Sequence, residues 1–268
     1  MKKLTTLVLM GLVIFASCDT KKTEKKDKLS ESPRHHEWID LQRSDSTICK
    51  AFVAYPESDK PTKSVIVIHE NRGLNDWART FADQLAQKGY LVIAPDLISN
   101  TVEGVEKTTD FKSSDEARKA IYGLDKDMVT ADLNAAYNYI KNDKASNQEV
   151  SVVGFCWGGS QTFRYATNNP DIKAALVFYG TAPRDSAVFA NIKAPVYGFY
   201  GGNDNRVNST IEDTKRHMIT EGKSYEYVVY EGAGHAFMRR GSQFDSNDEN
   251  RAAHKKAWTR LLEILKDG

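Results

Sequence analysis

Residues Gly154-Phe155-Cys156-Trp157-Gly158-Gly159 (GFCWGG) carry the clearest signal for the fold of this chain. The apolar run 150–155 predicts a buried strand before the cysteine, and residues 158–168 predict a helix after it. A nucleophile on such a tight strand-to-helix turn is held in a strained backbone conformation, and its neighbours two positions away must be small. Gly154 and Gly158 meet that requirement, so the stretch predicts a nucleophilic Cys156. The structural alternative is a glycine-rich turn around a buried cysteine.

Short apolar runs alternate with amphipathic stretches on both sides of this turn. Residues 64–69 (SVIVIH) are rich in β-branched side chains, as buried parallel strands are, and the apolar residues of 78–85 recur with the spacing of one helix face. This alternation predicts an α/β fold with a mostly parallel sheet and helices on both faces. The other expected strands are 47–55, 91–94, 175–179, 196–200 and 225–230, and the other expected helices contain 129–140 and 258–265.

Two further residues follow expected strands and can complete a catalytic group. Asp204 lies just after the strand 196–200, and His235 lies just after the strand 225–230. Open α/β sheets place their sites at the carboxyl ends of the strands, and the chain order nucleophile, acid, histidine is that of α/β-hydrolases. We therefore predict a triad of Cys156, His235 and Asp204. Taken singly, a loop aspartate is typical of a turn and a loop histidine is typical of a surface.

Together these motifs resemble the dienelactone hydrolases, a cysteine-nucleophile branch of the α/β-hydrolase fold. The resemblance extends from about Thr47 to Leu265, and besides GFCWGG it includes the motifs at 69–74 (HENRGL), 94–97 (APDL), 203–204 (ND) and 234–237 (GHAF). It implies hydrolysis of a small-molecule carboxylic ester or lactone without a cofactor. A thioesterase or a sugar-ester esterase is an alternative on the same site. A non-catalytic binding lipoprotein on a hydrolase scaffold is an alternative of another class.

The resemblance also implies roles for residues around the triad. The backbone N–H groups of Asn71 and Trp157 would form the oxyanion hole, which agrees with the general position of such donors. Glu70 would contact the resting thiol and move away when substrate binds; the alternative is a cap or an ion pair at the strand end. Arg239 would bind a carboxylate of the substrate.

Two departures from the family pattern bear on the substrate. The archetypal lactonase has a second carboxylate-binding arginine after the motif at 94–97, where this chain has Ser99 and Asn100, and a serine after the catalytic histidine, where this chain has Ala236. These departures argue against an anionic dienelactone. Arg72 or Arg206 could replace the missing arginine, or each could be a surface charge.

The N-terminus has the pattern of an export signal. Lys2 and Lys3 precede an apolar run of 14 residues, 4–17, which is too short to span a bilayer but suits a signal peptide. Its end, Phe15-Ala16-Ser17-Cys18, resembles the lipobox of bacterial lipoproteins, in which the cysteine is lipidated; an ordinary signal peptide is the alternative. We predict a signal peptide at 1–17, a lipidated Cys18 with a flexible Lys-rich tether at 18–34, and a hydrolase domain at 35–268. The protein would be exported and anchored to a membrane through Cys18, on the periplasmic or cell-surface side.

Charge and ligand spacing argue against other classes of function. The chain carries +1 overall, and without the net positive charge of residues 1–34 the remainder carries −3. An acidic body argues against nucleic acid as the main partner. No metal site is predicted, because His69 lacks the H-E-x-x-H spacing and the other His and Cys residues lack ligand spacing. No G-x-G-x-x-G turn follows a strand, so no dinucleotide site is predicted.

Two features leave alternatives open. Cys49, in the expected strand 47–55, is expected to be structural, but it could form a disulfide with Cys156 in an oxidising compartment. The segment 98–118 is polar and poorly periodic, which suits a lid over a site and a surface loop equally well.

Overall fold

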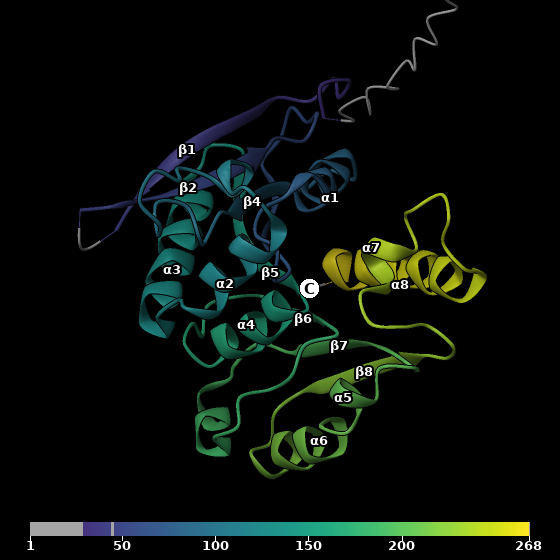
Figure 1. Cartoon of the computed structure of the whole chain (residues 1–268). Helices are drawn as coiled ribbons and strands as arrows, with labels where there is room; N and C mark the ends of the chain where they lie inside the picture. Colours follow the sequence, from purple (N-terminus) through teal and green to yellow (C-terminus); the bar gives the residue numbers. More distant parts are fainter. Residues whose placement is uncertain (1–28, 44–45, 268) are drawn as a thin grey trace, which may run out of the picture.

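Figure 1 shows the computed structural model of the chain, which describes residues 29–43 and 46–267. In these residues eight strands form one sheet in the order β1-β2-β4-β3-β5-β6-β7-β8. Strands β3 to β8 pair in parallel, and β1 and β2 add antiparallel pairs at one edge. The strands are β1 His36–Gln42, β2 Ile48–Ala54, β3 Thr62–Ile68, β4 Leu91–Pro95, β5 Ser146–Phe155, β6 Ala175–Phe178, β7 Val196–Gly201 and β8 Tyr225–Tyr230.

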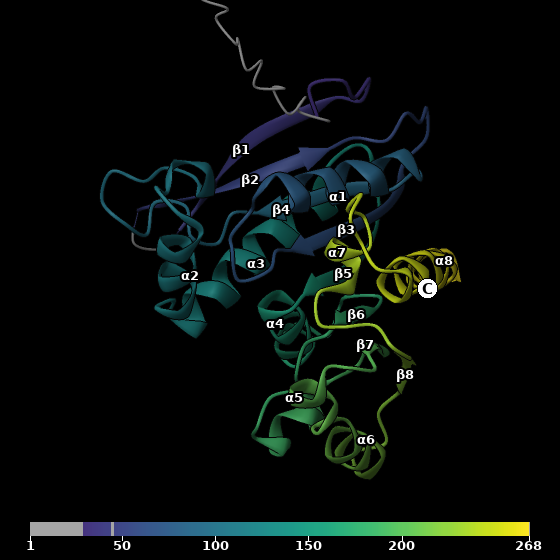
Figure 2. The ribbon, with the colours of Figure 1, turned by 45° about the vertical axis from the view of Figure 1, so that its right-hand side comes forward.

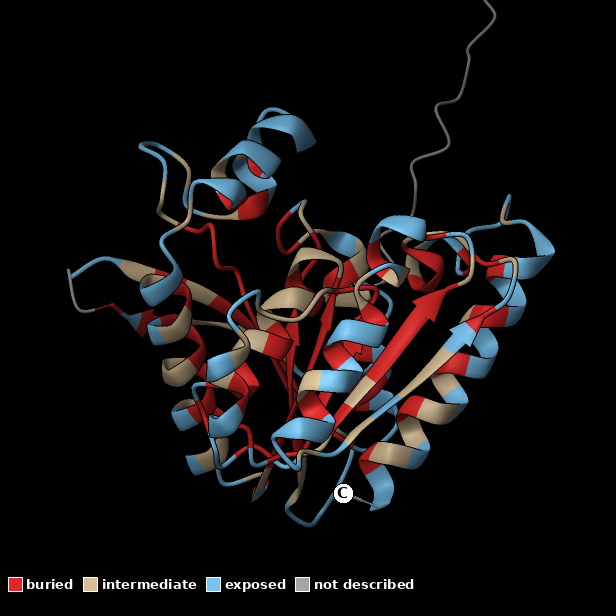
Figure 3. Cartoon of the chain, turned by 90° about the horizontal axis from the view of Figure 1, so that it is seen from below, coloured by how far each residue is buried: buried red, intermediate tan, exposed pale blue. Residues whose placement is uncertain are grey.

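Helices cover both faces of the sheet. Apolar side chains of α1 and α8 belong to one core cluster, and those of α3 and α4 belong to a second cluster. Figure 3 shows the buried strands between two layers of helices, so the predicted α/β-hydrolase fold with a mostly parallel sheet is confirmed. The helices are α1 Asp76–Gln87, α2 Ser114–Tyr122, α3 Lys126–Asn142, α4 Trp157–Ala166, α5 Asn205–Asn208, α6 Ile211–Thr220, α7 Phe237–Arg240 and α8 Asp248–Asp267, with short 3-10 turns η1 Thr108–Asp110 and η2 Ser186–Asn191.

The parallel register brings the carboxyl ends of the central strands to one edge of the sheet. Ile68, at the end of β3, pairs with Gly154 near the end of β5, and Phe155 pairs with the terminal Phe178 of β6. Gly201 and Tyr230, the last residues of β7 and β8, also pair with each other. Residues that follow these strands therefore meet at the same edge, as expected for the site of an open α/β sheet.

Several elements were not predicted from the sequence: the strand β1, the helices α2, α5, α6 and α7, and the two 3-10 turns. The strand β1 lies at the sheet edge, and most of its residues are only half-buried. The helix α2 lies in the polar part of the chain, and only Ala117 and Ile121 of this helix are buried. Figure 2 shows α2 at the left-hand side of the molecule, outside the layer of α3 and α4.

The last residues of the predicted tether contact the domain. Arg34 Nε and Nη2 lie 2.7 and 2.6 Å from the two carboxylate oxygens of Asp83 on α1, and Ser32 Oγ donates to the same carboxylate. A bidentate pair of this kind fixes the chain firmly, so Ser32 and Arg34 are held against α1. Cys18 and the predicted signal peptide lie outside the described residues. Among the helices that are described, none has the length and apolar character needed to cross a membrane.

Candidate active site

Cys156 lies in the turn between β5 and α4, and its backbone is strained, as the sequence predicted. Its φ of 56° and ψ of −114° fall outside the regions that residues with side chains ordinarily adopt. A Cβ on Gly154 would lie 2.2 Å from the carbonyl oxygen of Gly158, and a Cβ on Gly158 would lie 2.3 Å from the carbonyl oxygen of His69. Only glycine fits at these two positions, which explains the glycines on both sides of the cysteine.

The side chains of Cys156, His235 and Asp204 form a continuous hydrogen-bonded chain. His235 Nε2 lies 3.1 Å from Cys156 Sγ, and His235 Nδ1 lies 2.5 Å from Asp204 Oδ2. Asp204 follows β7 and is buried, whereas His235 follows β8 and is partly exposed. The structure therefore brings together three residues that the sequence placed after three different strands.

The charges of this chain of groups reinforce one another. Burial alone would lower the pKa of His235, but the hydrogen bonds to Asp204 and Cys156 and the charges of these groups raise it to about 9. Burial would raise the pKa of Asp204, but the hydrogen bond and charge of His235 hold it below its ordinary value. Asp204 is therefore a carboxylate at neutral pH, and His235 can hold a proton that the thiol gives up. Such an arrangement can move a proton from a thiol to a leaving group.

The two N–H groups predicted for the oxyanion hole make no hydrogen bond to any described residue. The Trp157 N–H belongs to the first turn of α4, where N–H groups have no intrahelical acceptor. Asn71 lies in the loop after β3. Both residues line the same pocket as Cys156, so both N–H groups remain available to a bound substrate.

Glu70 forms hydrogen bonds with Arg239 and Tyr179 and not with the thiol of Cys156. Its buried carboxylate accepts a hydrogen bond from Arg239 Nε at 2.6 Å and one from the Tyr179 hydroxyl at 3.2 Å. Burial, and then the charges of Glu70 and Cys156, raise the pKa of Tyr179 well above its ordinary value, so Tyr179 keeps the proton that it donates. Among the described residues, the hydrogen-bond partner of the thiol is His235. Glu70 and Arg239, which the resemblance assigned to the thiol and to the substrate, thus contact each other.

A buried polar network that was not predicted lies beneath the loop 69–74. The His69 ring stacks on the Trp157 ring, with centroids 5.6 Å apart. Thr108 Oγ1 accepts a hydrogen bond from the Leu74 amide at 2.9 Å and donates one to Asp96 Oδ1 at 2.6 Å. Burial lowers the pKa of His69 and raises that of Asp96. Because Thr108 belongs to the polar segment 98–118, this segment holds the loop 69–74, which contains Asn71, in place.

A pocket with a volume of about 590 Å³ contains Cys156 and His235 in its lining. Arg118 and Tyr122 of α2 also line it, and the side-chain Nδ2 of Asn71 donates to the Tyr122 hydroxyl at 3.2 Å. Among the described residues of the segment 98–118, Arg118 alone belongs to the pocket lining. The interpretation of this segment as a lid stays a prediction.

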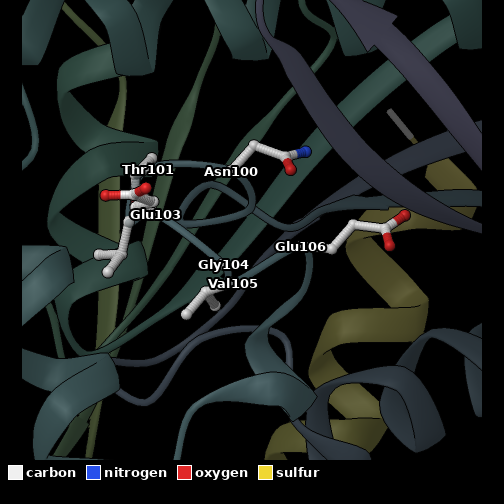
Figure 4. Close-up of a pocket in the computed structure, with 7 residues that line it drawn as sticks. Asn100, Thr101, Glu103, Gly104, Val105 and Glu106 are labelled. Atoms are coloured by element: carbon white, nitrogen blue, oxygen red, sulfur yellow. The ribbon is translucent and has the colours of Figure 1, made fainter.

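A separate hollow of about 550 Å³ is formed by the loop 100–106. Figure 4 shows that its charged side chains are Glu103 and Glu106. It is lined by none of the predicted site residues, so it is not part of the candidate active site.

Cys49 has no place in the site. It is fully buried on β2, and it and Cys156 are both free thiols rather than partners in a disulfide. Burial raises the pKa of the Cys49 thiol well above its ordinary value, so this thiol stays protonated and unreactive. Within 29–43 and 46–267, no group of three His, Cys, Asp or Glu side chains is placed to hold a metal ion.

Comparison with known proteins points to one family. The sequence model of the dienelactone hydrolase family matches residues 49–268. Two similar proteins, both named "Putative carboxymethylenebutenolidase", come from Methylorubrum extorquens and Escherichia coli. The first is 32% identical over 71% of this chain and 68% of its own length, and the second is 31% identical over 81% of each. The crystal structure of a "Putative Dienelactone Hydrolase" from Klebsiella pneumoniae superposes with a TM-score of 0.76 at 26% identity, covering 88% of this chain and 99% of that one.

Proposed function

This chain belongs to the dienelactone hydrolase family and is a hydrolase of carboxylic esters or lactones, and on this basis we propose its catalytic mechanism. Cys156 is the nucleophile, His235 is the general base and acid, and Asp204 orients His235 and stabilises its cation. The observation that carries the proposal is the hydrogen-bonded chain from Asp204 through His235 to Cys156 in a pocket that can admit a small ester.

The reaction proceeds through a thioester. Cys156 Sγ forms a bond to the carbonyl carbon while the thiol proton moves to His235 Nε2. The bond from that carbon to the leaving oxygen then breaks, and this oxygen takes the proton from His235. In a lactone the leaving oxygen stays attached to the acyl chain, because the broken bond is part of the ring. Water then adds to the thioester carbon and gives a proton to His235, and Cys156 leaves as a thiolate that recovers this proton.

The oxyanion of each tetrahedral intermediate is stabilised by the N–H groups of Asn71 and Trp157, and such donors contribute about 3–4 kcal/mol each to transition-state stabilisation where this has been measured. A thiolate leaves such an intermediate more readily than an amine or a simple alkoxide does. The site therefore suits enol and aryl esters, which have good leaving groups, better than amides.

Acid quenching during turnover of a 4-nitrophenyl ester tests the thioester. We expect intact-mass spectrometry to show one acyl group on the protein, and peptide mapping to place it on the peptide that contains Cys156. The proposal would be contradicted by an acyl group on a serine or lysine. It would also be contradicted if no acyl-protein formed during turnover under conditions that slow hydrolysis of the intermediate.

Glu70 is proposed to restrain the thiol through its charge and its pairing with Arg239. In the Glu70→Gln protein, Arg239 would lie near Cys156 without its counter-charge and would favour the thiolate. We therefore expect iodoacetamide to alkylate Cys156 about 10-fold faster in this variant near neutral pH, while turnover falls. The measurement is the rate of alkylation against pH, in a Cys49→Ala background.

The matched control is Arg239→Gln, which removes the opposite charge and should slow alkylation. If the profiles of Glu70→Gln and wild type coincide, Glu70 does not restrain the thiol, and it is an ion-pair partner of Arg239 only.

The N-terminal motif supports a second proposal, that Cys18 is lipidated and anchors the exported protein to a membrane on the periplasmic or cell-surface side. The motif lies outside the described residues and rests on the sequence alone. Cells that express the full chain should incorporate radiolabelled palmitate into the protein, and the protein should sediment with membranes. Cys18→Ala should remove the label, whereas Cys49→Ala should keep it. A wild-type protein that takes up no label would overturn the proposal.

A further inference from the structure

Five arginines line the pocket of Cys156, whereas within the described residues Glu70 supplies the one carboxylate in this lining. The arginines come from separate parts of the fold: Arg72 from the loop after β3, Arg118 from α2, Arg206 from α5, and Arg239 and Arg240 from α7. The whole chain is nearly neutral, with 37 basic and 36 acidic residues. The excess of positive charge is therefore a property of this pocket and not of the protein as a whole.

One of the five is neutralised by the protein itself, since Arg239 forms an ion pair with Glu70. Within residues 29–43 and 46–267, the side chains of Arg72, Arg118, Arg206 and Arg240 form no ion pair and no hydrogen bond. All four are exposed at the pocket. Like charges gathered around one opening repel each other, and a bound anion removes that repulsion.

The guanidinium group presents a planar fork that matches a carboxylate or a phosphate. One or two guanidinium groups are enough to bind a single carboxylate. One negative charge on the substrate therefore does not account for four unpaired guanidinium groups from four parts of the fold. Two or more negative charges on one substrate do account for them. We propose that the natural ester carries at least two negative charges on the part remote from the scissile carbonyl. This proposal rests on the function proposed above.

The lining also contains less polar residues, which suit the uncharged part of such a substrate. Tyr179 packs against His235 with ring centroids 5.0 Å apart, and Ala236 and Trp157 complete a less polar wall beside the thiol. This wall suits the uncharged ester group. The unpaired arginines lie on the exposed part of the lining, where the charges of the substrate would bind.

The arginines of this anion site differ from the two carboxylate-binding arginines of the archetypal lactonase. Ser99, near the position of the archetype's second arginine, is fully buried, accepts a hydrogen bond from the Lys50 amide and donates one to the Asp96 carbonyl. It cannot reach a substrate. Arg118 and Arg240, which sequence reasoning did not single out, take part instead.

Three aryl esters of similar length test the proposal with the purified protein. They are 4-nitrophenyl butyrate, mono(4-nitrophenyl) glutarate and the terminal mono(4-nitrophenyl) ester of propane-1,2,3-tricarboxylate, which carry no, one and two negative charges. We expect kcat/KM to rise by about 10-fold per charge, mainly through KM. The preference should weaken in about 0.5 M NaCl. An ester with a phosphonate in place of the two carboxylates shows which of the two groups the site prefers.

Arg118→Gln and Arg206→Gln locate the site. Each should lower the ratio of kcat/KM for the doubly charged ester over the neutral ester by about 5- to 10-fold. Arg216→Gln is the matched control, because Arg216 is an exposed arginine of α6 that pairs with Asp213 outside the pocket. A neutral ester preferred over the charged ones, or a ratio that Arg118→Gln and Arg206→Gln leave at the wild-type value, overturns the proposal.

Calorimetric titration with propane-1,2,3-tricarboxylate keeps the two proposals distinct, because it does not need turnover. If this anion binds to wild type and more weakly to Arg118→Gln, but no ester is hydrolysed, the anion site stands and the proposed function fails. If the neutral ester is hydrolysed and the anion does not bind, the proposed function stands and the anion site fails.

Discussion

Cys156→Ala protein should hydrolyse 4-nitrophenyl butyrate at least about 10⁴-fold more slowly than wild type, because removing the nucleophile of such a triad removes the covalent pathway altogether. Water would have to attack the ester without a thioester intermediate. The N–H groups of Asn71 and Trp157 would still bind the carbonyl oxygen, so some hydrolysis above the uncatalysed rate should remain. The measurement is kcat under steady-state conditions, with the fold of each variant checked by circular dichroism.

Cys49→Ala is the matched control for this prediction. Cys49 is the other cysteine among the described residues, and it is buried on β2 away from the pocket. Its replacement removes one buried sulfur and is expected to lower stability rather than turnover. Equal loss of activity in Cys49→Ala and Cys156→Ala would show that the cysteines support the structure, and the nucleophile would have to be sought elsewhere.

The turn around Cys156 could be predicted because its requirements are local. The strand before it is a continuous apolar run, and the two glycines are needed by close backbone contacts within and beside the turn. Asp204 and His235 could be placed because each follows a strand with a clear apolar pattern, and parallel strands end at one edge. Topology alone then makes the three residues neighbours.

Two of the elements that were missed, α2 and β1, have weak local patterns. In α2 only Ala117 and Ile121 are buried, so the helix shows no long apolar stripe, and in β1 most residues stay half-buried at the sheet edge. The first half of α8 is also polar, and the apolar stripe used to predict it began about ten residues after its actual start at Asp248.

Contacts between distant segments could not be predicted from spacing. The ion pair of Glu70 with Arg239 joins residues 169 positions apart. Arg118 reaches the pocket from α2, and the chain before this helix is held by the hydrogen bond from Thr108 to the buried Asp96. Such positions follow from tertiary packing, because exposed arginines and a polar loop carry no periodic signal of their own.

Asp204→Asn should lower kcat by about 10³- to 10⁴-fold through its effect on His235. An asparagine that donates its amide N–H to His235 Nδ1 forces the ring proton onto Nε2, which faces the thiol and then cannot accept its proton. The change also removes a negative charge and a strong hydrogen bond, both of which raise the pKa of His235. The variant is therefore expected to lose both the correct tautomer and the stabilisation of the imidazolium.

The pH dependence gives this prediction a second, independent measurement. His235, with a pKa of about 9, loses its proton as the pH rises through that value, so wild-type activity should fall there, and in Asp204→Asn that fall should begin at lower pH. The free energy of unfolding should also fall as the pH rises, for the same reason. A pKa raised above the unfolded value of about 6.5 stabilises the folded state fully below that pH, and this contribution is lost as the pH rises through about 9. Denaturation of wild type by urea between these two pH values should therefore show a decline in the free energy of unfolding that Asp204→Asn lacks. Asp213→Asn, which removes an exposed carboxylate of α6, should keep the wild-type profiles. If Asp204→Asn keeps them too, Asp204 serves only the turn before α5 and does not act through His235.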